Sequence, residues 1–122
     1  MIIGIGVDVV DLARFERASR TPALLSRLFA DSERTSNGRE LASHSLAARF
    51  AAKEALIKAI GDSTGMRWHD MQVAADEHGN PSFVISGGIA AIMAARGITT
   101  LHLSMSHDGG VAIAYVIAEG SA

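Results

Sequence analysis

The chain has 122 residues, of which 48% are hydrophobic, and its formal net charge at pH 7 is −2. This composition excludes disorder as the default, and the charge gives no case for nucleic acid, whose binders carry an excess of Lys and Arg. The absence of cysteine excludes disulfides and thiolate sites and fits a reducing, cytoplasmic compartment. We find no signal peptide and no apolar run that could span a bilayer, so we expect no membrane partner and one domain over residues 1–122.

The first half of the sequence predicts one strand followed by helices. Apolar residues alternate with Gly and Asp at the N-terminus, a period of two that indicates a strand. Asp11 is a good N-cap for the next helix, and Pro22 favours the start of another. We expect Ser43 or Ser45 to cap a central helix. The predicted elements are a strand over 3–10, helices over 12–20 and 23–29, a mobile loop over 31–38 and a central helix that ends at Gly61.

The second half predicts strands around one helix. The predicted elements are strands over 71–75 and 82–86 joined by a turn, a helix over 88–96, and a hairpin with strands over 101–107 and 111–118. The last of these strands is apolar on both faces, so we expect both faces to be covered. The fold class is therefore α+β, with an antiparallel sheet packed around a buried central helix.

The central helix carries charges on an otherwise apolar surface. A helix that is apolar all round is normally buried, and buried charges need a partner, a metal or a ligand. Glu54 and Lys58 are four residues apart and point the same way. An ordinary helix ion pair is the alternative, worth only a few tenths of a kcal/mol. The apolar surroundings favour a functional pair.

Asp8 is the second chemical signal. It shares a strand face with Gly4 and Gly6, whose missing side chains leave room for a ligand or for another backbone. Taken alone, Asp8 is better explained as the start of a turn. Together with Glu54 it suits Mg²⁺, which takes one or two protein carboxylates plus substrate phosphates. Lys58 and Arg49 would then neutralise phosphate oxygens, as phosphoryl transfer requires.

Three motifs resemble one known family. They are the Gly-Ile-Gly-Val-Asp start over 4–8, the run over 49–55 with Lys58 and Ala59, and the Ser-Met-Ser-His run over 104–107. In the same order and at similar spacing, they are similar to the signatures of the holo-acyl-carrier-protein synthases, the small type of 4′-phosphopantetheinyl transferase. Residues 68–73 and 79–81 match the family's middle hairpin. The run over 28–33 resembles a further element, with Ala30 in place of the usual threonine.

The resemblance implies a reaction and a set of roles. Family members move the 4′-phosphopantetheine arm of coenzyme A onto a serine of apo acyl carrier protein, in fatty acid biosynthesis, and release adenosine 3′,5′-bisphosphate. Asp8 and Glu54 would bind Mg²⁺, and Lys58 would stabilise charge on the transferred phosphate. Glu54, or a water that it orients on the metal, would take the serine proton. The expected coenzyme A contacts are Arg49, Lys58, Ser106 and His107.

The resemblance also implies two kinds of protein partner. Arg14 and Arg17 belong to a basic stripe that spacing alone would explain as a solvated face. Acyl carrier proteins are acidic around their serine, so this stripe becomes the expected docking surface. Family members of this size are homotrimers with sites shared between subunits. The surplus apolar surface expected on the alanine side of the central helix and on the last strand fits that arrangement.

Two other functions remain open at this stage. A metal-dependent nucleotide phosphohydrolase could use the same carboxylates and lysine, although the chain lacks a P-loop. A non-catalytic module that binds carrier proteins could use the arginine stripe alone. Lys53 faces away from Lys58, and the sequence gives it no role.

Overall fold

The computed structural model describes residues 1–121. Its elements, in chain order, are β1 (Ile2–Asp11), α1 (Leu12–Ala18), α2 (Pro22–Leu28), η1 (Asp31–Glu33), β2 (Thr35–Ser36), β3 (Arg39–Glu40), α3 (Ser43–Ile60), η2 (Trp68–Asp70), β4 (Met71–Ala75), β5 (Pro81–Ile85), α4 (Gly87–Ala95), β6 (Ile98–Asp108) and β7 (Val111–Gly120). This mixture of helices and antiparallel strands confirms the predicted fold class. Within residues 1–121, no helix is both long enough and apolar enough to cross a membrane.

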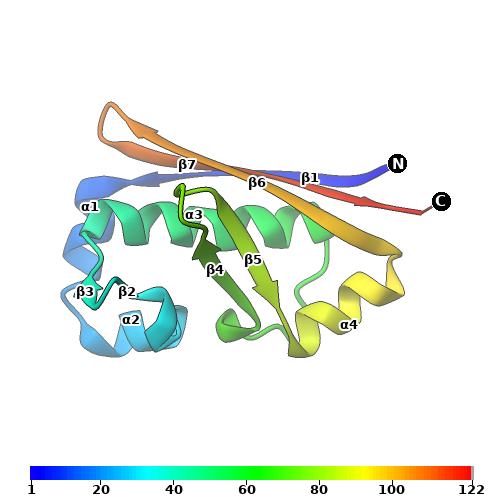
Figure 1. The fold of residues 1–122 in the computed structure, drawn as a ribbon, viewed down its shortest axis with the longest axis horizontal. Coiled ribbons are helices and arrows are strands. Elements are labelled where there is room, and N and C mark those ends of the chain that lie inside the picture. Colours follow the sequence, from blue (N-terminus) through cyan, green and yellow to red (C-terminus); the bar gives the residue numbers. More distant parts are fainter. Residues whose placement is uncertain (122) are drawn as a thin grey trace.

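The architecture centres on α3. A three-stranded antiparallel sheet in the order β1-β7-β6 covers one side of this helix. Figure 1 shows α2, α4 and the separate β4–β5 hairpin on its other side. The alanines of α3, among them Ala51, Ala52 and Ala55, are fully buried in the main hydrophobic cluster. Small side chains there let the sheet approach the helix closely.

Two glycines of β1 explain how close that approach is. A Cβ atom added to Gly4 would lie 1.8 Å from the carbonyl oxygen of Ala59, and one added to Gly6 would lie 1.8 Å from that of Ala55. The room left by these glycines is therefore filled by the backbone of α3 and not by a ligand. This contact fixes which turns of the helix face the N-terminal half of β1, namely those of Ala55 and Ala59.

The local start and stop signals were mostly predicted correctly. The Asp11 side chain accepts a hydrogen bond from the Arg14 backbone at 2.8 Å, which confirms it as the cap of α1. Gly61 ends α3 in the left-handed conformation, as predicted. The predicted serine cap of α3 is wrong, because Ala42 occupies that position and no side chain bonds the free amides.

The segment over 31–38 is more structured than predicted. It contains the short helix η1 and the strand β2, which turns into β3 through Asn37 and Gly38, both at positive φ. Glu33, within η1, is only 1% exposed. A loop prediction based on polar composition misses this side chain because its partner is remote in the sequence.

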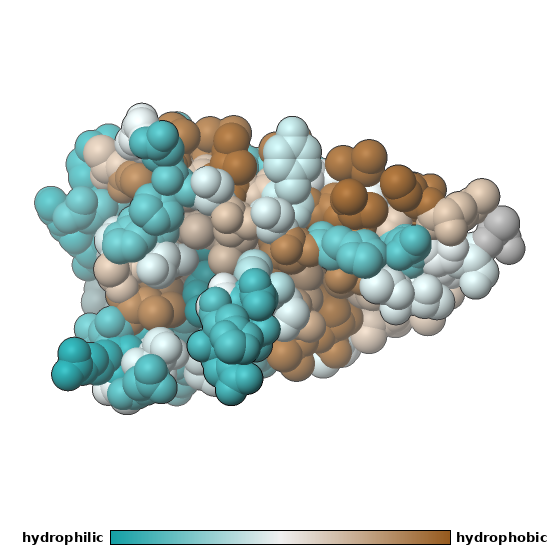
Figure 2. Space-filling view, turned by 45° about the horizontal axis from the view of Figure 1, so that its top comes forward, coloured by the Kyte–Doolittle hydropathy of each residue, from teal (hydrophilic) through white to brown (hydrophobic). Residues whose placement is uncertain are grey.

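The outer face of the sheet corrects a further expectation. On β7, Ala114, Val116 and Ala118 are buried against α3, but Tyr115 on the opposite face is 51% exposed. Its neighbours on β1 are also open to solvent, with Val9 55% exposed. One chain therefore covers only one face of its last strand. Figure 2 shows hydrophobic side chains gathered on this side of the molecule.

Candidate active site

Asp8, Glu54 and Lys58 come together where β1 crosses α3. The Lys58 ammonium lies 3.1 Å from Asp8 Oδ1 and donates a second hydrogen bond to the Val7 carbonyl at 2.9 Å. The Asp8 side chain is 18% exposed, whereas Lys58 is 53% exposed, so the prediction that Lys58 is buried is wrong. An exposed ammonium beside a sheltered carboxylate can leave its partner and reach a bound anion.

Glu54 lies within electrostatic range of both neighbours. Its partial burial raises its pKa above the usual value, the negative charge of Asp8 raises it further, and Lys58 lowers it. The two carboxylates that the sequence could not place together are therefore close enough to repel each other. Such a pair favours a proton or a cation between its members.

A cavity of 690 Å³ opens beside this cluster. Asp8 and Glu54 line it together with Arg14, and the remaining wall is mainly apolar. Its apolar lining includes Phe15, Leu24, Leu28, Phe50 and Trp68. The site thus combines carboxylates at one side with a hydrophobic wall, a composition typical of ligand pockets.

The two arginines predicted for docking lie on α1, next to this cavity. Arg14 lines the cavity, and its side chain is exposed. Arg17 is exposed one turn further along the helix. Figure 2 shows that hydrophilic side chains dominate the end of the molecule where α1 and α2 lie in Figure 1.

The other predicted residues form a second group. Arg49, Ser106 and His107 line a smaller cavity of 230 Å³ that does not include Asp8, Glu54 or Lys58. The ring of His107 packs against that of His44 with their centroids 4.9 Å apart.

The members of this second group come from different faces. Ser106 pairs with Ile113 on the outer face of the sheet, and His107 pairs with Ala112 on the inner face, as alternation predicts. Arg49 donates a hydrogen bond to the Val73 carbonyl, and burial lowers its pKa. In one chain, the predicted site residues therefore occupy two separate places.

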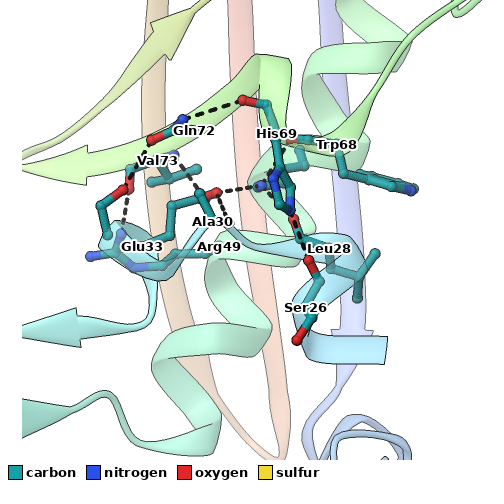
Figure 3. Close-up of polar contacts among 11 residues, drawn as sticks. Ser26, Leu28, Ala30, Glu33, Arg49, Trp68, His69, Gln72 and Val73 are labelled. Atoms are coloured by element: carbon teal, nitrogen blue, oxygen red, sulfur yellow. Dashed lines mark hydrogen bonds and ion pairs between the residues drawn. The ribbon is translucent and has the colours of Figure 1, made fainter. Parts of the chain in front are cut away.

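Sequence reasoning missed the most buried charges of the molecule. Lys53 and Glu33 are 0% and 1% exposed, and Lys53 Nζ lies 2.8 Å from Glu33 Oε1. Glu33 also accepts hydrogen bonds from the backbone amides of Ala30 and Val73, both at 3.0 Å (Figure 3). Removing one member of such a pair costs about 3 to 5 kcal/mol, because the other charge stays buried.

A signal for this pair exists in the sequence. Glu33 is the last residue of the run over 28–33, the element that resembles the synthase family but had no assigned role. Lys53 belongs to the central motif and also had none. Two unexplained charges of opposite sign, each in a recognisable motif, are a reasonable basis for predicting a pair.

Comparison with known proteins identifies the family. A family model described as the 4′-phosphopantetheinyl transferase superfamily matches residues 4–116. The chain belongs to this superfamily. It is 61% identical over 123 aligned positions to a holo-acyl-carrier-protein synthase of Clavibacter michiganensis, with 100% of this chain and 99% of the relative covered.

Solved structures of phosphopantetheinyl transferases have the same fold. A complex of ACPS with CoA from Chronobacterium ammoniagenes matches with a TM-score of 0.84 and 28% identity over 98% of both chains. The holo-acyl-carrier-protein synthase of Neisseria meningitidis matches with a TM-score of 0.83 and 33% identity over 98% of this chain and 99% of that one. These comparisons confirm the resemblance seen in the three motifs, and the chain is a transferase of this family.

Proposed function

We propose that this phosphopantetheinyl transferase moves the 4′-phosphopantetheine arm of coenzyme A onto a serine of apo acyl carrier protein, with Asp8, Glu54 and Lys58 at the reacting phosphate. The observation that carries the proposal is the meeting of these three side chains from β1 and α3, with Asp8 and Glu54 lining the 690 Å³ cavity. The two carboxylates can bind a cation that accompanies the phosphoryl group, and the exposed ammonium can neutralise the phosphoryl oxygens.

The carboxylate pair fits a divalent cation, for which we propose Mg²⁺. Within residues 1–121, no group of three or more metal-ligating side chains is present, so Asp8 and Glu54 would need oxygen ligands from the substrate or water. This is the usual pattern for Mg²⁺, which keeps waters and binds substrate phosphates. The raised pKa of Glu54 reflects an unfavourable charge that such a cation would neutralise. When bound, Mg²⁺ would offset the negative charge of the diphosphate.

The protein side chains supply proton transfer and charge stabilisation. The serine hydroxyl oxygen forms a bond to the phosphorus that carries the pantetheine arm, and the bond from this phosphorus to adenosine 3′,5′-bisphosphate breaks. Glu54 accepts the serine proton as the general base. Lys58, free to turn from Asp8 toward the phosphate, stabilises the negative charge that develops there.

We further propose that the working enzyme is a homotrimer with shared active sites. Arg49, Ser106 and His107 are the proposed coenzyme A contacts, yet they line a cavity apart from Asp8 and Glu54 in the same chain. A neighbouring subunit placed on the exposed outer face of the sheet could join the second group of one chain to the carboxylates of another. The exposed apolar side chains of that face support such a contact.

Arg14 and Arg17 are the proposed docking residues for the carrier protein. Arg14 lines the cavity and Arg17 lies one turn further along α1, so an acidic carrier surface bound to them would bring the serine to Asp8 and Glu54. Electrostatic pairing of this kind mainly speeds encounter and sets orientation.

Mass measurement of the carrier tests the reaction. The chain is incubated with coenzyme A, Mg²⁺ and an apo acyl carrier protein, and the carrier is then weighed by mass spectrometry. We expect a gain of one phosphopantetheine group, and no gain when the chain is left out. Release of free phosphate without modification would favour a phosphohydrolase, and binding without modification would favour a carrier-binding module.

A further inference from the structure

Lys53 is a buried cation that the proposed reaction does not use. Its ammonium donates hydrogen bonds to the Leu28 carbonyl at 2.6 Å, to Glu33 Oε1 at 2.8 Å and to the Trp68 carbonyl at 3.1 Å. The Phe29 ring covers it, with the centroid 5.1 Å away. A lysine ammonium has three donors, so every one of them has an acceptor here.

Two of these acceptors belong to the walls of the cavity beside Asp8 and Glu54. Leu28 is the last residue of α2 and Trp68 is the first of η2, and both line that cavity, whereas Lys53 itself does not. Figure 3 shows Leu28 and Trp68 on the same side of the polar contacts around Glu33. Lys53 therefore joins three elements at one point: α3, which carries Glu54, and the two walls that face it.

Apart from Lys53, both walls meet α3 through apolar packing, in which Leu28 shares a hydrophobic cluster with Leu46 and Ala47 of the helix. The Trp68 ring lies 5.8 Å from the ring of Phe50 on α3, a contact without strong directional preference. His69 bonds the Ser26 carbonyl at 2.8 Å, but this links α2 to η2 and neither of them to α3. The ammonium thus provides directed bonds that set the distance from both walls to α3.

We propose that Lys53 is a positioning residue for the transfer reaction: through the carbonyls of Leu28 and Trp68 it holds the cavity walls at the distance from Glu54 that the substrates require. This role rests on the proposed function, which places the reacting phosphate at that cavity. Glu33 neutralises the lysine from outside the cavity, and its remaining bonds go to Ala30 and Val73.

Two substitutions separate positioning from simple stability. Lys53→Met and Glu33→Gln both abolish the ion pair and both should lower the melting temperature. Only Lys53→Met also removes the bonds to the Leu28 and Trp68 carbonyls, since a lysine left without its acid partner still has donors for both. At a temperature where both variants are folded, we expect kcat to fall roughly tenfold to a hundredfold in Lys53→Met, because an ångström of misplacement has effects of that size. Glu33→Gln should keep the wild-type kcat.

Trp68 supplies a second readout that does not depend on activity, because it is the sole tryptophan. Its fluorescence emission should move to longer wavelength in Lys53→Met and stay at the wild-type value in Glu33→Gln. If Lys53→Met alone fails to fold, the double variant Glu33→Gln with Lys53→Met leaves no buried charge and should show the same losses.

The outcomes distinguish this inference from the proposed function. A wild-type chain that transfers no phosphopantetheine would overturn the proposed function. If the wild type is active, the positioning role of Lys53 can fail by itself. Equal kcat and equal fluorescence emission in Lys53→Met and Glu33→Gln would overturn that role and leave the proposed function standing.

Discussion

Gly6 is the position at which one added methyl group tests most directly how the active site is assembled. In Gly6→Ala the new Cβ would lie 1.8 Å from the Ala55 carbonyl oxygen and 2.8 Å from the backbone nitrogen of Ala59. Non-bonded heavy atoms lie about 3.5 Å apart, so α3 would have to withdraw from β1 by roughly 1.7 Å. Both obstructing atoms belong to a helix backbone, which cannot rotate away as a side chain could.

The displacement should affect stability and activity together. Overpacking a well-filled core costs about 1 to 3 kcal/mol, and we expect the upper end or more because the clash is with backbone. Moving α3 would also carry Glu54 and Lys58 away from Asp8. A shift of about 1 Å between reacting groups can reduce turnover by about a hundredfold, so kcat should fall by that order.

Urea denaturation followed by circular dichroism measures the loss in the free energy of unfolding. Steady-state transfer assays, at a temperature where the variant is folded, measure the loss in kcat. Gly38→Ala is the matched control, because Gly38 has positive φ but nothing within 4 Å of the added Cβ. It should lose only the roughly 1 kcal/mol of a strained left-handed residue and keep full activity. A Gly6→Ala enzyme with wild-type stability and kcat would refute the close helix-to-strand packing.

Three further predictions concern charge and assembly. The folded-state pKa of Glu54 is raised above its usual 4.5, so the folded chain binds that proton more tightly than the unfolded one, and the stability this provides is lost as pH rises through the folded value. In EDTA at pH 7, Glu54→Gln should therefore melt at a higher temperature than wild type. The difference between the two melting temperatures should shrink as pH falls toward 4.5. A variant that melts below wild type at pH 7 would contradict this. Arg14→Glu should raise KM for the carrier protein and leave coenzyme A binding intact. As a control, Arg96→Glu at the far end of the molecule should change neither. An unchanged KM in Arg14→Glu would contradict the proposed docking surface. Tyr115→Asp on the outer sheet face should give a folded monomer without transfer activity in sedimentation and kinetic assays, and a fully active monomeric wild type would disprove shared sites.

Local features of the fold were predictable from the sequence where short-range chemistry determines them. The alternation around Gly4 and Gly6 indicated β1, and Asp11 and Gly61 marked helix ends that the structure confirms. The preference of serine for N-cap positions gave a wrong prediction at the start of α3, because Ala42 occupies the cap there. Propensity alone cannot choose between neighbouring candidates when packing fixes the helix end.

The parts that escaped prediction depend on contacts between distant segments. Lys53 could not be explained without Glu33, which lies 20 residues earlier and is brought to it by the path of the chain around α3. The separation of Arg49 from Glu54 depends on which side of the helix faces β4. The exposed outer face of β7 depends on what lies beyond one chain, and the pattern of its residues could indicate only that it should be covered.

Magnesium binding tests the central claim most directly, which is that Asp8 and Glu54 form one cation site at the reacting phosphate. Calorimetric titration of Mg²⁺ into the chain with coenzyme A present should give one site per chain. Asp8→Asn and Glu54→Gln should each weaken binding by at least about tenfold and abolish transfer, as expected when one of two carboxylate ligands is lost. A Glu54→Gln enzyme with wild-type Mg²⁺ affinity and full turnover would contradict it.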